Sequence, residues 1–161
     1  MRVVSGIEVT LVRTAEEGPA FPVGGKFSVS SPAGSTQAQE WIYVKASTGL
    51  TVVGTLVSRA AGSGTCDACV ATPNSDSTLR VIGVVQHAIA DGSFGFVQCK
   101  GIATVLIETG VSANAGLQVG NTTDGRADAL TAAITGMGMG YSLAAISTGD
   151  TGQAWINCPG A

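Results

Sequence analysis

Short runs of alternating apolar and polar residues recur along the chain, separated by glycine, proline and small polar residues. Over residues 7–11, for example, isoleucine, valine and leucine alternate with glutamate and threonine. Such alternation, like short runs rich in Val, Ile, Thr and aromatic residues, predicts β-strands. The strands predicted in this way span residues 7–12, 26–30, 41–46, 50–53, 55–58, 80–90, 94–100, 102–108, 117–119, 139–147 and 153–158. The pattern therefore predicts an all-β fold, a compact antiparallel β-barrel or β-sandwich built from hairpins.

Two segments depart from this pattern. Residues 59–78 form a long connection of small and polar residues, with a short strand expected around Val70; connections of this length are more often functional or mobile than buried. Residues 128–134 predict one or two helical turns, ended by Gly136. The length of 161 residues suits one domain. We expect a single β-rich domain over residues 27–161, and an extended N-terminal arm or a first strand over residues 1–26.

Part of the sequence repeats. Residues 83–95 align with residues 140–152 without gaps, and three glycines, one alanine and one isoleucine are identical. After a two-residue shift, residues 96–101 match residues 155–160. Two readings stay open: two hairpins of similar composition by chance, or two equivalent hairpins that close one barrel or sandwich.

Composition and charge exclude several classes of protein. The chain has 23 glycines, only 12% charged residues and a net charge of −3. So apolar a chain is not intrinsically disordered, and its few scattered cations do not form the basic surface that nucleic-acid binding needs. The longest uncharged stretch, residues 129–149, contains four glycines and does not predict a membrane helix. The first residues lack the apolar core of a secretory signal. We expect a soluble protein made in the cytoplasm, with neither nucleic acid nor membrane as its partner.

Four cysteines are the first candidates for chemistry: Cys66, Cys69, Cys99 and Cys158. Cys66 and Cys69 form a C-x-x-C motif within the long connection, and all four together would match the ligand number of a zinc site. Cys99 and Cys158, however, lack the close spacing of a second ligand pair, and no predicted helix follows the motif, as redox chemistry of the thioredoxin type requires. Free or structural thiols are the favoured reading, while a disulfide, a metal site and redox catalysis stay open.

The remaining chemistry candidates are isolated. His87 is the only histidine and lies in a predicted strand, so an acid–base or nucleophilic arrangement would have to use it. The only adjacent carboxylates, Glu16 and Glu17, lie in a predicted turn. Residues 124–128 resemble a fragment of a calcium loop but read better as a hairpin turn, and the glycosylation sequon at residues 121–123 lacks a secretory context. We expect no catalytic, cofactor-binding or metal-binding residues, and no enzyme.

A series of motifs gives the chain a family resemblance. In order they are Y-V-K-A at residues 43–46, L-T at 50–51, I-G-V-V at 82–85, A-D-G-S-F-G-F-V-Q at 90–98, G-I-A-T-V at 101–105, A-G-L-Q-V at 115–119 and G-R-A at 125–127. In this order they resemble small capsid-decoration (cement) proteins of tailed bacteriophages. The resemblance covers about residues 41–128, and residues 140–158 fit the last hairpin. The connection at residues 59–78 and its C-x-x-C motif fall outside it.

The resemblance implies a structural protein of the virion. Such a protein binds the outside of an expanded icosahedral capsid as a trimer or dimer and stabilises the contacts between major capsid subunits. Low charge and many small residues suit close packing against a partner, and an arm can add a strand to the sheet edge of a neighbour. Many copies on a lattice turn weak single contacts into tight retention.

Two alternatives from other classes stay open. A β-module of a phage tail, baseplate or fibre would have similar composition and would act in attachment. A small enzyme would have to use His87 or Cys66.

Overall fold

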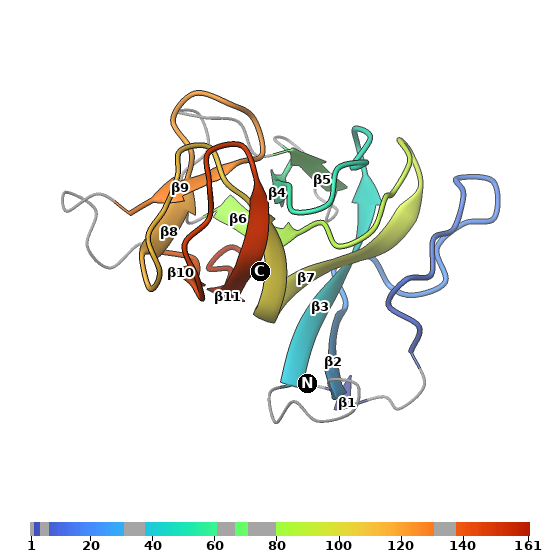
Figure 1. Ribbon diagram of the computed structural model, residues 1–161. Helices are drawn as coiled ribbons and strands as arrows, with labels where there is room; N and C mark the ends of the chain where they lie inside the picture. Colours follow the sequence, from blue (N-terminus) through green and yellow to red (C-terminus); the bar gives the residue numbers. More distant parts are fainter. Residues whose placement is uncertain (1, 4–6, 31–37, 61–66, 71–79, 131–137) are drawn as a thin grey trace.

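A computed structural model describes residues 2–3, 7–30, 38–60, 67–70, 80–130 and 138–161 of the chain (Figure 1). These residues form β-strands and no α-helix, which confirms the all-β prediction, and none of their segments is a helix suited to cross a membrane. The strands are β1 (Arg2–Val3), β2 (Lys26–Ser30), β3 (Ala38–Ala46), β4 (Leu56–Arg59), β5 (Asp67–Val70), β6 (Val81–Val84), β7 (Phe94–Leu106), β8 (Gly116–Val119), β9 (Ala127–Ala129), β10 (Gly140–Ser142) and β11 (Thr151–Asn157).

Strands β3, β5, β4, β6 and the first part of β7 form a closed five-stranded barrel, which we call the first half. Each strand pairs with the next in that order, and antiparallel pairing of β7 with β3 closes the ring. Aliphatic side chains fill its interior, among them Val44, Leu56, Ile82 and Val97, all of them buried. Because alternate residues of a strand point to opposite faces, Trp41 and Tyr43 of β3 point outward instead.

The second part of β7 begins another ring, the second half, with β11, β10, β8 and β9 paired in that order. An isolated parallel bridge between Ile107 and Ala127 returns from β9 to the end of β7. In the first half Ala46 and Ala68 pair in parallel at the same place, where β3 meets β5. The two halves therefore share one connectivity, and β7 is the last strand of one and the first strand of the other.

Bridges outside the strands repeat as well. Leu50 pairs with Ile89 in the first half, and Val111 pairs with Ile146 in the second. Ile89 and Ile146 are matched positions of the sequence repeat. The repeat is therefore structural, which settles the reading left open between chance and equivalence, and it extends over both halves rather than over two hairpins.

The two-residue shift expected in the repeat is wrong. Val84 pairs with Gln98 in the first half, and Tyr141 pairs with Trp155 in the second. Gln98 rather than Phe96 is therefore equivalent to Trp155, and the alignment continues without a gap. The shift matched aromatic residues, whereas the backbone pairing fixes the register.

The N-terminal segment covers the outer face of the first half (Figure 1). Four aromatic residues of β3 and β7 form this face, and apolar residues from 7 to 29 pack on them: Ile7, Val9, Phe21, Val23, Phe27 and Val29 on Trp41, Tyr43, Phe94 and Phe96. The strand predicted over residues 7–12 is wrong, because the chain turns there and Leu11 N donates to Glu8 O at 3.1 Å. The alternating burial nevertheless holds, since it comes from side-chain contact with the aromatic face.

Other strand predictions needed new boundaries. Residues 94–106 form one strand instead of two, since Gly101 adopts a φ of +102° and lets β7 continue. Residues 51–54 form a turn rather than a strand, whereas the short strand expected near Val70 is confirmed as β5. Of the helical turns predicted over residues 128–134, the first two residues lie in β9 instead, and residues 131–134 fall outside the described residues.

Candidate functional site

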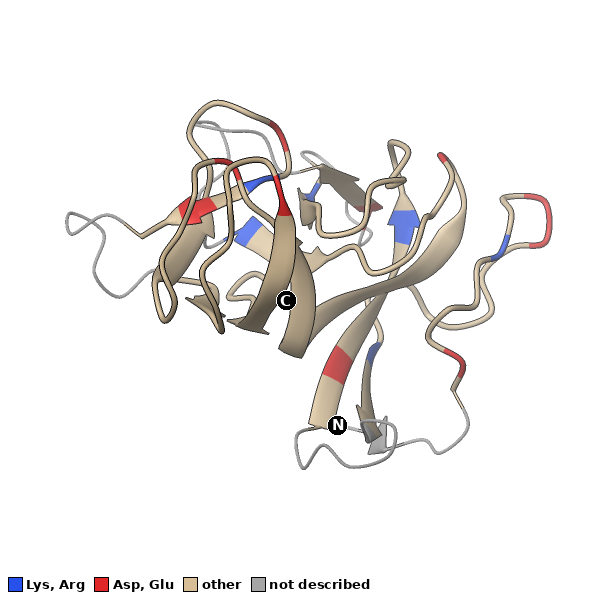
Figure 2. Cartoon of the chain, in the orientation of Figure 1, with Lys and Arg blue, Asp and Glu red and all other residues tan. Residues whose placement is uncertain are grey.

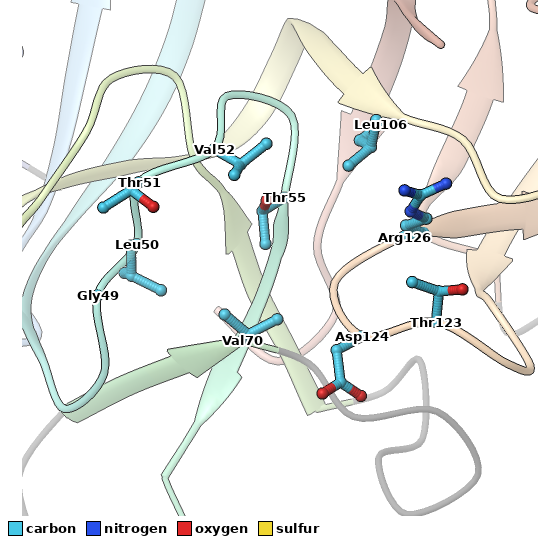
Figure 3. Close-up of a pocket in the computed structure, with 10 residues that line it drawn as sticks. All are labelled: Gly49, Leu50, Thr51, Val52, Thr55, Val70, Leu106, Thr123, Asp124 and Arg126. Atoms are coloured by element: carbon cyan, nitrogen blue, oxygen red, sulfur yellow. The ribbon is translucent and has the colours of Figure 1, made fainter. Parts of the chain in front are cut away.

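A pocket of about 260 Å³ lies where the two halves meet (Figure 3). One wall comes from the loop before β4 and the end of β5, and the other from the end of β7 and the turn between β8 and β9. The residues lining it are Gly49, Leu50, Thr51, Val52, Thr55, Val70, Leu106, Thr123, Asp124 and Arg126.

Two backbone hydrogen bonds join these walls. Leu106 N donates to Gly54 O at 2.9 Å, and Leu56 N donates to Gly125 O at 2.7 Å. Gly125 has a φ of +71°, and a Cβ there would lie 2.7 Å from Val70 Cγ1. The turn therefore approaches the first half so closely that its residue at this point must lack a side chain.

Glu108 holds the same turn from within the second half. Its Oε1 accepts a hydrogen bond from Thr123 N at 3.0 Å. Burial works against ionisation of this carboxyl, but hydrogen bonds from Thr122, Thr123 and Asn121 outweigh it and lower its pKa. The carboxylate thus stabilises the turn over residues 121–125. The hairpin predicted at residues 124–128 is confirmed by the β8–β9 pairing, although residues 127 and 128 lie in β9 and not in the turn itself.

The pocket offers apolar contact and a few polar groups. Leu50, Val70 and Leu106 supply the apolar lining, and in Figure 3 the side chains of Asp124 and Arg126 lie apart from one another. Among the described lining residues there is no histidine, cysteine or serine. The geometry suits a small ligand or one side chain of a partner, and none of the catalytic candidates that the structure describes lines the pocket.

The cysteines lie in two places. Cys99 and Cys158 are buried and adjacent, and Cys158 N donates to Cys99 O at 2.9 Å. Burial raises the pKa of Cys99 to about 11 and raises that of Cys158 as well, so both thiols are protonated at neutral pH.

Cys69 lies on β5 with its Sγ 3.7 Å from Ser58 Oγ. Cys66 falls outside the described residues. The three described thiols are free, and the described part of the chain contains no cluster of His, Cys, Asp and Glu suited to a metal.

His87 does not lie in a strand, as had been expected. Strand β6 ends at Val84, and His87 occupies a bend before the bridge at Ile89. Both imidazole nitrogens are buried, and neither has a hydrogen-bond partner within the described ranges. Burial lowers the pKa of His87, so the imidazole is neutral near pH 7.

The adjacent carboxylates have a local role. Glu17 accepts hydrogen bonds from the backbone N and the hydroxyl of Thr14, at 2.9 and 3.2 Å, and these bonds lower its pKa. Glu16 is exposed in the same turn. Glu17 thus stabilises the turn of the N-terminal segment.

Sequence reasoning missed a stacked aromatic pair with one exposed ring. Tyr141 of β10 is 41% exposed and stacks on Trp155 of β11, with ring centroids 5.7 Å apart. Leu143, just beyond β10, is 39% exposed, and Ile102 of β7 pairs with Trp155. The sequence placed each residue in a predicted strand without showing which side chains are exposed. Only the register across β7, β11 and β10 places them on one outer face.

Comparison with known proteins shows a similarity in fold but none in sequence family. No protein-family model and no curated protein sequence matches the chain. Its fold is similar to a solved structure described as the N base of head fiber gp8.5 in bacteriophage phi29, with a TM-score of 0.53 and 13% sequence identity. The match covers 73% of this chain and 92% of that chain. At this identity the similarity shows a common all-β fold.

Proposed function

We propose that this chain is a structural protein of a bacteriophage particle, and specifically a decoration protein on the outside of the capsid. In this proposal it binds the major capsid protein of an expanded shell as a homo-oligomer, a trimer or a dimer. It stabilises contacts between shell subunits and catalyses no reaction.

The fold likeness to the phi29 head fibre base carries this proposal. Nearly all of that chain is covered, so the similarity concerns a complete architecture rather than one hairpin. The motif order from residue 43 to residue 127 points to the same class of protein independently. The architecture also suits the task, since two halves that share β7 make a stiff body.

The experiment is a binding assay on capsids. Expanded shells lacking this protein are mixed with the purified chain, and bound protein is counted by gel densitometry and located by electron microscopy. The proposal expects saturable, stoichiometric density on the outer surface. Unexpanded shells are the control and should bind less. A chain that stays monomeric by light scattering and leaves expanded shells bare would overturn the proposal.

A second candidate is a fibre module that acts in attachment, and the fold similarity to the base of a head fiber favours it. The two candidates differ in what binding does to the shell. A decoration protein raises the temperature at which capsids rupture, because it bridges neighbouring subunits, whereas a fibre base occupies its site with little effect on rupture. Differential scanning calorimetry of bare and saturated shells separates them.

A further inference from the structure

The first half shows what one face of this repeated architecture binds. Its Gln86 side chain hydrogen-bonds to the backbone of β7: Nε2 donates to Thr104 O at 2.9 Å, and Thr104 N donates to Oε1 at 3.1 Å. Two residues further along β7, Leu106 N donates to Gly54 O at 2.9 Å. This face of the first half therefore holds an extended strand by its backbone.

The second half builds the same face. In the first half Gly54 N donates to Val85 O at 2.8 Å, and Val85 N donates to Thr55 O at 2.9 Å. In the second half the matching bonds are these: Asn114 N donates to Ser142 O at 2.9 Å, and Ser142 N donates to the carbonyl oxygen of residue 115 at 3.0 Å. Asn114 is thus equivalent to Gly54.

The backbone conformation agrees with this equivalence. Asn114 has a φ of +61° and Gly54 a φ of +90°, both in the left-handed region. Leu143 follows Ser142 as Gln86 follows Val85. Leu143 therefore occupies the position of Gln86, which hydrogen-bonds to the backbone of β7 in the first half.

In the second half this face has no covering segment among the described residues. We define it as the open face: Asn114, Tyr141, Leu143 and Trp155. Asn114, Tyr141 and Leu143 are exposed. Residues 138–161 contain a single charged residue, Asp150, and Figure 2 shows β10 without charge. An exposed apolar face of this kind, on a chain that elsewhere covers its aromatic residues, marks an interaction site.

We infer that the open face binds an extended, uncharged strand of the capsid shell protein. The Asn114 carbonyl would accept a backbone N–H of that strand, as Gly54 does from Leu106. Tyr141 and Leu143 would contact its apolar side chains, where the first half uses the side-chain hydrogen bonds of Gln86. Strand addition of this kind combines main-chain hydrogen bonds with side-chain selectivity. The identity of the partner rests on the proposed function.

The second copy of this chain is the less suitable occupant. Its own N-terminal segment, residues 7–29, already packs its apolar side chains on the aromatic face of the first half. Gly24 N donates to Tyr43 O at 2.7 Å, and Tyr43 N donates to Gly25 O at 2.9 Å. Binding to another copy would have to break these bonds, whereas a shell protein brings a strand of its own.

The test compares two surface variants of equal exposure. Leu143→Asp places a charge on the open face, and Val53→Asp places one on the first half; both native side chains are 39% exposed. Each variant is titrated onto expanded, undecorated shells, with circular dichroism to verify folding. We expect Leu143→Asp to weaken binding about tenfold or more, and Val53→Asp to bind like the wild type. Equal binding by both variants would overturn the inference and leave the proposed function standing.

A photo-crosslinking amino acid at position 143 supplies a second measurement that does not depend on a destabilising charge. The expected product joins this chain to one segment of the shell protein, identified by mass spectrometry, and the same crosslinker at position 53 should give none. A product between two copies of this chain would overturn the inference, as would the absence of any product. If the wild type fails to bind shells at all, both the inference and the proposed function fail.

Discussion

Gly140 lies where the neighbouring backbone leaves no space for a side chain. It has a φ of +150°, and a Cβ there would collide with the carbonyl oxygen of Trp155 and lie 2.9 Å from Ile156 Cα. Because these are backbone atoms of a paired strand, they cannot move aside. We expect Gly140→Ala to lower the free energy of unfolding by about 3 kcal/mol, measured by urea denaturation. Gly49→Ala is the control: its nearest neighbour would be 3.7 Å away, and we expect a change below about 0.5 kcal/mol. Similar losses in both variants would contradict this account.

His87 should make stability depend on pH. Its folded-state pKa is lowered by burial, so below about pH 6.5 the unfolded chain takes up a proton that the folded chain does not. The free energy of unfolding should therefore fall between about pH 7 and about pH 5. Glu17 and Glu108, whose pKa values are also lowered, lose their contributions only at lower pH. His87 is the only histidine, so His87→Gln should flatten the curve over this interval. An unchanged slope in the variant would show that the imidazole is not responsible.

At the same scale, the sequence predicted the fate of some site residues and not of others. Cys99 and Cys158 behave as small buried hydrophobic residues, as favoured, because composition and strand context suffice to place a thiol in a core. The exposure of Tyr141 could not be predicted. A short apolar run in a closed barrel looks the same whether its outer face is covered or bare, and only the neighbouring strands decide which.

At the scale of elements, the strands with strong local patterns were predicted and their connections were not. Lys26–Ser30 and the core of β3 appear as expected because their side chains alternate or are buried on both faces. Residues 7–12 have the same alternation without strand pairing, since contact with an aromatic surface selects the same side chains as a sheet does. A pattern of burial thus predicts contact more reliably than hydrogen bonding.

The repeat illustrates the same limit. Glycines at turns and close approaches kept matching positions, such as Gly95 and Gly152, which both leave room for an isoleucine. Elsewhere the equivalent residues differ in kind, as Gln98 and Trp155 do, so the sequence revealed a pair of hairpins where the structure has two halves of the same connectivity. The strand register is the same in both halves even where the equivalent side chains differ, because each strand pairs with its neighbours and this pairing constrains the main chain.

For the molecule as a whole, the sharing of β7 predicts one cooperative unit. Residues 94–98 pair with β3 in the first half, and residues 100–106 pair with β11 in the second, so neither ring keeps all its strands without the other. Hydrogen bonds from Leu106 to Gly54 and from Leu56 to Gly125 join the halves again beyond this strand.

The two tryptophans give a direct measure of this coupling. Trp41 lies on β3 of the first half and Trp155 on β11 of the second, and the chain contains no other tryptophan. In Trp41→Phe, fluorescence reports the second half alone; in Trp155→Phe, it reports the first half; and far-UV circular dichroism reports both halves. Within each variant we expect the fluorescence and dichroism curves in urea to have the same midpoint and slope, as in a two-state transition. If the halves are instead independent, fluorescence and dichroism will separate, and one half will stay folded where the other has melted. That result would make β7 a linker between two domains rather than a strand that both rings need.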